Sequence, residues 1–207
     1  MQLPHLQNRG YSNAILLGIT LSPEYIQILS STPDYIQQMH DSNQIDEDEF
    51  HAKERLTDKL ADKLADFISK KGYSAFSQSE NNLGLTGSYN EETKHSPLPH
   101  KTIAGRAGLG WIGKHNLLVS PEYGSAISMC TVLTDAPLQT VAHAPPISKC
   151  GDCSICIDIC KAGALKGTTW TMGTTRDELL DVHRCTSCLR CLALCPWTQK
   201  YMKDNMP

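Results

Sequence analysis

The stretch CGDCSICIDIC at residues 150–160 is matched in spacing by CTSCLRCLALC at residues 185–195. Both stretches follow the pattern CxxCxxCxxxC, and together they contain eight of the nine cysteines of this 207-residue chain. Disulfide-rich secreted domains spread their cysteines over the whole chain, whereas these are confined to two short blocks. The pattern therefore indicates reduced thiols that bind metal.

The spacing is typical of the bacterial ferredoxin run, in which the fourth cysteine of each run binds the cluster of the other run. Each close triplet can hold three corners of one 4Fe-4S cluster, while the fourth cysteine faces the partner cluster. Pro196 keeps the proline that ends the pattern, whereas Lys161 replaces it after the first block. The alternatives are two structural zinc sites or free thiols. The spacing predicts two crossed ligand sets, namely Cys150, Cys153, Cys156 and Cys195 for one cluster, and Cys185, Cys188, Cys191 and Cys160 for the other.

Composition and charge limit the classes of function. With 40% hydrophobic and 20% charged residues, the chain can form one full domain and a second, smaller one. A formal charge of −3 provides no basic field, which disfavours nucleic acid and an anionic membrane as partners. The apolar stretch at 14–21 is too short to cross a bilayer, and no export signal precedes it. We therefore expect a cytoplasmic protein without a membrane partner.

Hydrophobic patterning predicts an α+β fold in front of the cysteine blocks. Strands are expected at 14–21, 73–78, 115–120 and 125–134. A long helix is expected within 46–72, with an apolar stripe formed by Leu56, Leu60, Leu64, Phe67 and Ile68. The division predicted is an α+β cofactor- or partner-binding domain at 1–145 and a ferredoxin-like module with two 4Fe-4S clusters at 146–207, with a proline-containing joint at 141–149.

A glycine-rich turn at residues 105–114 is the second candidate site. Gly108, Gly110 and Gly113 match GxGxxG, but a helical segment precedes them and an extended one follows, the reverse of a dinucleotide-binding unit. These glycines let the backbone approach a flat or bulky group, and Arg106 and Lys114 can meet an anionic one. The alternative is a tight packing turn without a ligand.

With these residues in place, the chain resembles the epoxyqueuosine reductases, which are relatives of the reductive dehalogenases. The resemblance rests on RAGLGWIGK at 106–114, SPEYG at 120–124, LTDAPL at 133–138, the first cysteine block and CPW at 195–197. It implies a nitroreductase-like domain that binds cobalamin beside a two-cluster ferredoxin module. In that family, electrons pass through the clusters to cobalt, and the cobalt reduces the substrate.

The chain departs from this family in its proton donor and in its length. The family places an acid three residues before a proline, and aligning Pro97 puts Lys94 at that position. The N-terminal segment and C-terminal helical repeats of the longer enzymes have no counterpart here. The sequence thus assigns no catalytic residue. The candidates for proton delivery near the turn are His95, His100, His115 and Tyr123.

Two functions from different classes follow. The first is an iron-sulfur oxidoreductase, resembling epoxyqueuosine reductase, that passes electrons to a cofactor or substrate held by residues 1–145. The second is a ferredoxin-type electron carrier or redox subunit without a substrate of its own. Either function requires a redox partner protein or a low-potential electron donor, and we expect a homodimer that completes the nitroreductase-like frame.

Overall fold

The structure is a computed structural model that describes residues 10–140, 147–171 and 173–206. Its main sheet is antiparallel with the order β1-β5-β2, formed by β1 (Asn13–Thr20), β5 (Ile127–Thr134) and β2 (Ala75–Ser77). A smaller antiparallel pair joins β3 (Trp111–Ile112) to β4 (Leu118–Val119). Each of the expected strands therefore has a counterpart, although the one at 115–120 is short.

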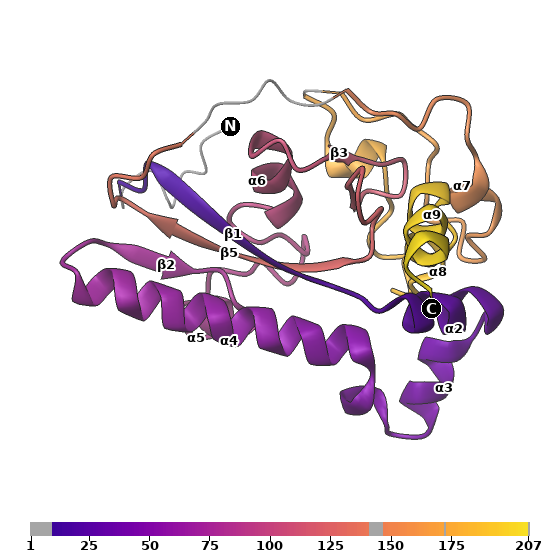
Figure 1. Cartoon of the computed structure of the whole chain (residues 1–207), viewed down its shortest axis with the longest axis horizontal. Helices are drawn as coiled ribbons and strands as arrows, with labels where there is room; N and C mark the ends of the chain where they lie inside the picture. Colours follow the sequence, from indigo (N-terminus) through magenta and orange to yellow (C-terminus); the bar gives the residue numbers. More distant parts are fainter. Residues whose placement is uncertain (1–9, 141–146, 172, 207) are drawn as a thin grey trace.

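Helices surround the main sheet and form the end of the chain (Figure 1). Among the described residues they are α2 (Pro23–Ser31), α3 (Tyr35–Asp41), η1 (Ile45–Glu47), α4 (Glu49–Lys70), α5 (Glu80–Leu85), α6 (His100–Arg106), α7 (Ile155–Asp158), η2 (Arg176–Glu178), α8 (Arg190–Ala193) and α9 (Pro196–Asn205). Helices α2 and α4 both start at side-chain caps. The Ser22 hydroxyl accepts from the Tyr25 N–H at the start of α2, and Asp48 accepts from the His51 N–H at the start of α4.

Helix α4 lies along one face of the main sheet, and its buried face differs from the expected one (Figure 1). Ala61, Ala65 and Ile68 pack against Cys130 and Val132 of β5. The predicted stripe was right for Leu64 and Ile68, which pack in this core, and wrong for its other three members. The exposed fractions of those three are 47% for Leu56, 41% for Leu60 and 57% for Phe67. Small residues face the sheet because they let the helix backbone approach the strands closely.

Cys130, the cysteine outside the two blocks, is completely buried in this helix–sheet layer. Burial is the main reason why the pKa of its thiol is raised, with nearby Asp58 adding to the effect. The residue thus packs as a small apolar side chain, as expected for a lone cysteine in an apolar strand.

The opposite face of the sheet carries the elements that lead to the glycine turn. Phe76, Leu83 and Leu133 form a core there, and α6 contacts both β1 and β5. The β3–β4 pair follows α6 directly, so the turn at 107–110 lies between this face and the end of the chain that holds the cysteines (Figure 1).

A third core joins the two ends of the chain. Helices α8 and α9 pack on α2, and the buried residues that they share include Ile26, Leu29, Leu192 and Tyr201. The Tyr201 hydroxyl donates to the Leu21 carbonyl at 2.8 Å. Residues on both sides of the predicted boundary at 145 therefore contribute to one core. Residues 141–146, which include most of the expected joint, lie outside the described residues.

Candidate metal centre

Four cysteines from the two blocks line one cavity of about 240 Å³. We call Cys150, Cys153, Cys156 and Cys195 the first cysteine group. Cys156 and Cys195 are buried, and both are 7% exposed. The other residues that line the cavity are Lys114, His115, Lys149, Pro196 and Trp197. The structure thus brings together three cysteines of the first block and the last cysteine of the second, which is the grouping that the spacing predicts.

Local sequence explains how these cysteines are presented. The Cys153 N–H donates to the Cys150 carbonyl at 3.0 Å, closing a tight turn in which Gly151 has a φ of +50°. Cys156 lies in the single-turn helix α7. Cys195 is the N-cap residue of α9, where Pro196 occupies the first turn and preorganises the helix. Cys195 is therefore fixed by a helix packed on the N-terminal half of the chain.

The remaining cysteines, Cys160, Cys185, Cys188 and Cys191, form a second cysteine group in more open surroundings. Cys185 is exposed, and the other three are half-buried. Burial, followed by the charges of Cys188 and Cys185, raises the pKa of the Cys191 thiol to about 12. For Cys156, burial and then Cys150, Cys153 and Cys195 raise the pKa to about 11. For Cys191, the charge of Cys156 from the first group ranks ahead of that of Cys160, so Cys191 has thiol neighbours in both groups.

Two tryptophans form a wall beside the first cysteine group. Trp111 of β3 and Trp197 of α9 meet edge to face, with ring centroids 4.9 Å apart, and Cys195 and Cys150 pack in the same cluster. The Lys149 ammonium lies 5.6 Å from the Trp111 ring centroid. Trp111 is 1% exposed, and its indole N–H has no hydrogen-bond partner among the described residues. Trp111 packs with Cys150 and Cys195 but does not itself line the cavity, so its buried indole N–H is a local cost of this packing.

Lys114 connects the glycine turn to the first cysteine block. Its ammonium donates to the Gly151 carbonyl at 2.7 Å and to the Cys153 carbonyl at 3.1 Å. These bonds hold the loop of the first cysteine group against the β3–β4 pair. The cation also lines the cavity itself. Lys114, which was predicted to contact an anionic cofactor, therefore lies beside the first cysteine group.

The other predicted residues of the glycine turn have different surroundings. A Cβ atom on Gly110 would lie 2.1 Å from the Val119 carbonyl oxygen, and one on Gly113 would lie 2.8 Å from the His115 ring. Both glycines are therefore required by close packing of the chain on itself. Gly108, which has a φ of +75°, and Arg106 are exposed. Only this outer end of the turn is open to a cofactor, and its role in binding one stays a prediction.

His115 is held neutral at the edge of the cavity. Its Nδ1 accepts from the Leu117 N–H at 3.2 Å, so the ring proton lies on Nε2, 3.3 Å from the Ser125 hydroxyl. The Ser125 hydroxyl in turn donates to the Leu118 carbonyl at 2.7 Å. Burial, and secondarily the Lys101 charge, lowers the pKa of His115 to about 4. Both ring nitrogens face partners within the protein, which argues against His115 as a proton donor.

The remaining proton-delivery candidates are dispersed. Burial lowers the pKa of His100 to about 4, and its Nδ1 lies 2.8 Å from the Thr131 hydroxyl. His95 is exposed, and Tyr123 stacks edge to face on Tyr201. Lys94, at the position of the family's acid, forms an ion pair with Glu91 at 2.9 Å. The structure does not gather these residues into one site.

Sequence reasoning missed Lys101, which lies beside His115. Burial, and then the nearby Arg176 charge, lowers the pKa of its ammonium to about 7. The ammonium donates to the Asn116 carbonyl at 2.8 Å. A lysine in a polar helical segment suggests a solvated side chain. The signal that could have found it is its spacing of three residues from Ala104, which is fully buried on α6.

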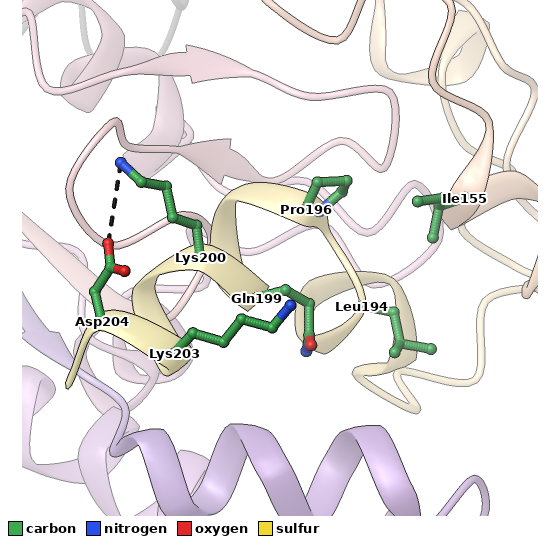
Figure 2. A pocket seen from close by; sticks show the side chains of 7 residues that line it. All are labelled: Ile155, Leu194, Pro196, Gln199, Lys200, Lys203 and Asp204. Atoms are coloured by element: carbon green, nitrogen blue, oxygen red, sulfur yellow. Dashed lines mark ion pairs between the residues drawn. The ribbon is translucent and has the colours of Figure 1, made fainter. Parts of the chain in front are cut away.

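A shallow surface hollow of about 410 Å³ adjoins the metal centre (Figure 2). Ile155, Leu194 and Pro196 form its apolar end, and Gln199, Lys200, Lys203 and Asp204 of α9 line the remainder. Ile155 and Leu194 directly precede Cys156 and Cys195 in the sequence. Pro196 also lines the cavity of the first cysteine group, so this hollow and that cavity share a wall.

Two further observations concern the described part of the chain. No three or more His, Cys, Asp or Glu side chains converge there closely enough to hold a single metal ion. None of its helices has the length and apolar character needed to cross a membrane.

Comparison with solved structures gives the class of fold first. The chain is similar to the catabolic reductive dehalogenase NpRdhA, with a TM-score of 0.60 and 20% identity, over 92% of this chain and 27% of that one. A second reductive dehalogenase structure, described with a mechanism for B12-dependent dehalogenation, has a TM-score of 0.60 at 18% identity, over 92% of this chain and 27% of that one. At these identities the similarity establishes a mixed α/β fold of the reductive dehalogenase kind.

Comparison with curated proteins narrows the relationship. The chain is 36% identical to an epoxyqueuosine reductase of Synechococcus sp. (strain CC9605), over 53% of this chain and 39% of that protein. It is 33% identical to the epoxyqueuosine reductase of Bacillus anthracis, over 53% of this chain and 32% of that protein. The sequence matches no family profile. The chain is thus a homologue of epoxyqueuosine reductases over about half its length, and the match covers less than two fifths of these relatives.

One solved epoxyqueuosine reductase concerns the predicted partners. That structure contains an epoxyqueuosine-modified tRNA stem loop, and it matches 70% of this chain and 39% of its own, with 23% identity and a TM-score of 0.48. Net charge led us to disfavour nucleic acid as a partner. The tRNA stem loop belongs to that protein, and the expectation that this chain has no nucleic-acid partner stays a prediction.

Proposed function

We propose that the protein is an iron-sulfur oxidoreductase that passes electrons through two 4Fe-4S clusters to a cofactor or substrate held by its N-terminal domain at 1–145. The observation that carries the proposal is the cavity of the first cysteine group. Cys195 lines this cavity together with three cysteines of the first block, although at least 39 residues separate it from each of them. This is the crossed arrangement of the two-cluster ferredoxin run. The names of the curated relatives support a reductase role.

The residues at the cavity fit an iron-sulfur cluster. Four thiols provide the donor set, and the cations of Lys114 and Lys149 line the same cavity, where they would offset the charge of thiolate ligands. Clusters bound here would supply one-electron transfer. The chain's own contribution is to enclose the first cysteine group between Trp111 and Trp197, to place Lys114 and Lys149 beside it, and to leave the second group more exposed.

Cobalamin is the cofactor that we propose to test first for the N-terminal domain, which we expect to be nitroreductase-like. The proposal is supported by the homology to epoxyqueuosine reductases and by the fold shared with a B12-dependent dehalogenase. Arg106 and Gly108 form the exposed end of the glycine turn and are the residues available to meet it. Cobalamin would supply a strongly reducing metal centre at that position.

Anaerobically purified protein, incubated separately with cobalamin and with a flavin and then gel-filtered, tests this assignment. We expect cobalamin to co-elute with the protein and to show a shifted visible spectrum. Arg106→Gln should weaken retention, whereas Lys59→Gln on the exposed side of α4 should leave it unchanged. Retention of neither compound by protein with intact clusters would favour the alternative, an electron carrier or redox subunit.

A separate assay tests which substrate the protein reduces. The curated relatives are named for epoxyqueuosine, so an epoxyqueuosine-modified tRNA stem loop is the first substrate to test. Cobalamin-loaded protein with a chemical reductant should remove one oxygen atom from the modified base, which mass spectrometry detects. Unchanged RNA from loaded and reduced protein would show that the substrate is a different one.

A further inference from the structure

We infer that the surface hollow beside Pro196 is the docking surface for a small acidic electron-transfer protein, which delivers electrons to the first cysteine group. The inference rests on the proposed function, because it requires a cluster at that group. It adds the kind of partner and the surface on which it binds.

The first step of the argument is proximity. Pro196 lines both the hollow and the cavity of the first cysteine group, and Ile155 and Leu194 adjoin Cys156 and Cys195 in the chain. An electron donor seated in the hollow would therefore contact Pro196, which also lines that cavity. Ile155 is 41% exposed, although it adjoins a buried cysteine. Apolar contact at the centre with charge at the rim is typical of protein interfaces.

The second step is charge. Lys200 and Lys203 project from α9 at the edge of the hollow, and both are exposed (Figure 2). The Lys200 ammonium reaches Asp204 at 4.0 Å, the outer limit of an ion pair, whereas Lys203 has no carboxylate partner among the described residues. In a chain with a net charge of −3, this rim is a local positive site. Such a site attracts and orients an acidic partner, mainly through the association rate.

The transfer is a one-electron step. A flavodoxin in its anionic hydroquinone form is a suitable probe, because loss of one electron gives the neutral semiquinone without moving a proton. The oxidised cluster gains that electron. The semiquinone absorbs at wavelengths distinct from iron-sulfur absorption, so both partners can be followed in one stopped-flow experiment.

The test compares two charge-reversal pairs in anaerobically purified holo-protein. Lys200→Glu with Lys203→Glu should lower the second-order rate of reduction by reduced flavodoxin at least tenfold at low ionic strength. The difference should shrink as salt is raised, because exposed charges are screened. The control variant, Lys59→Glu with Lys63→Glu on α4, changes the net charge by the same amount at a different site. Its rate should stay within about twofold of the wild-type rate, because the position of the charges, and not their total, controls docking.

Dithionite separates failure of this inference from failure of the proposed function. Each variant should retain its iron and be reduced by dithionite at the wild-type rate, which shows that the metal centre is intact. Equal slowing by the two pairs, or no slowing by the α9 pair, would overturn the docking surface while leaving the proposed function standing. Wild-type protein that contains no reducible iron would overturn the proposed function itself.

Discussion

The two cysteine groups share a sequence pattern but differ in their surroundings. The first is enclosed by two tryptophans, a neutral histidine and Lys114, whereas the second includes the exposed Cys185. The difference arises because the first group packs against the β3–β4 pair and the N-terminus of α9. Identical spacing in the two blocks therefore does not give identical surroundings, because the packed partner determines burial and charge, and these would set the potentials of any clusters bound there.

Removing one cysteine from each group is the largest perturbation of this comparison. If the groups are crossed, Cys195→Ser should affect the same cluster as Cys150→Ser, although 45 residues separate the two positions, and should reduce the iron content by up to about four atoms per chain. Electron paramagnetic resonance and iron analysis check the result. The crossed assignment would be contradicted if the electron paramagnetic resonance spectrum of Cys195→Ser matched that of Cys185→Ser.

Loss of the clusters should loosen the tail unevenly. Among the described residues of 147–190 few apolar side chains are buried, so we expect this stretch to depend on bound metal, whereas α8 and α9 share a core with α2. After oxidative cluster loss, hydrogen exchange should rise strongly around both cysteine blocks, less in α9, and least in α4. Uniform exchange across the three regions would show that cluster binding does not stabilise the tail selectively.

The core shared by α2, α8 and α9 can be tested directly. Leu29 is 1% exposed at its centre, so Leu29→Ala should lower the free energy of unfolding by about 2–5 kcal/mol. The matched control is Leu56→Ala on the exposed side of α4, for which we expect a loss below about 1 kcal/mol. Urea titration of both variants measures these values, and equal losses would refute the assigned burial.

The charge of Lys114 should affect the reduction potential of a cluster at the first cysteine group and not that of a cluster at the second. Lys114→Gln removes a cation from the first group and should lower one of two reduction potentials, because the charge that favours the added electron is lost. Lys114→Arg should restore the potential, and Lys63→Gln should change neither. Potentiometric titration followed by electron paramagnetic resonance resolves the two steps, and an equal shift of both would contradict the placement of Lys114.

The smallest expected effect is a pH dependence from His100. Its pKa is lowered to about 4 in the folded protein from an ordinary value near 6.5, so the unfolded chain binds more protons between these values. Stability should therefore be full above about pH 6.5 and decline as the pH falls toward 4. In His100→Gln the decline between pH 6.5 and 5 should be shallower in urea titrations, and an unchanged slope would exclude this contribution.

Particular residues show where sequence reasoning succeeded and where it failed. Periodicity located α4, but it favoured leucines over the alanines that face β5, because a pattern of hydrophobicity does not contain the distance between helix and sheet. Cysteine spacing predicted two ligand sets, and the four cysteines of one set line a common cavity, whereas the assignment of ligands to clusters stays a prediction. The roles of Trp111 and Lys149 could not be predicted, because they depend on contacts between distant segments.

The most direct test of the account is the metal content of the wild-type protein. Anaerobic purification followed by iron and acid-labile sulfide analysis should give about eight of each per chain, with the visible absorption of 4Fe-4S clusters. Colourless protein that contains zinc, or no metal, would contradict the account.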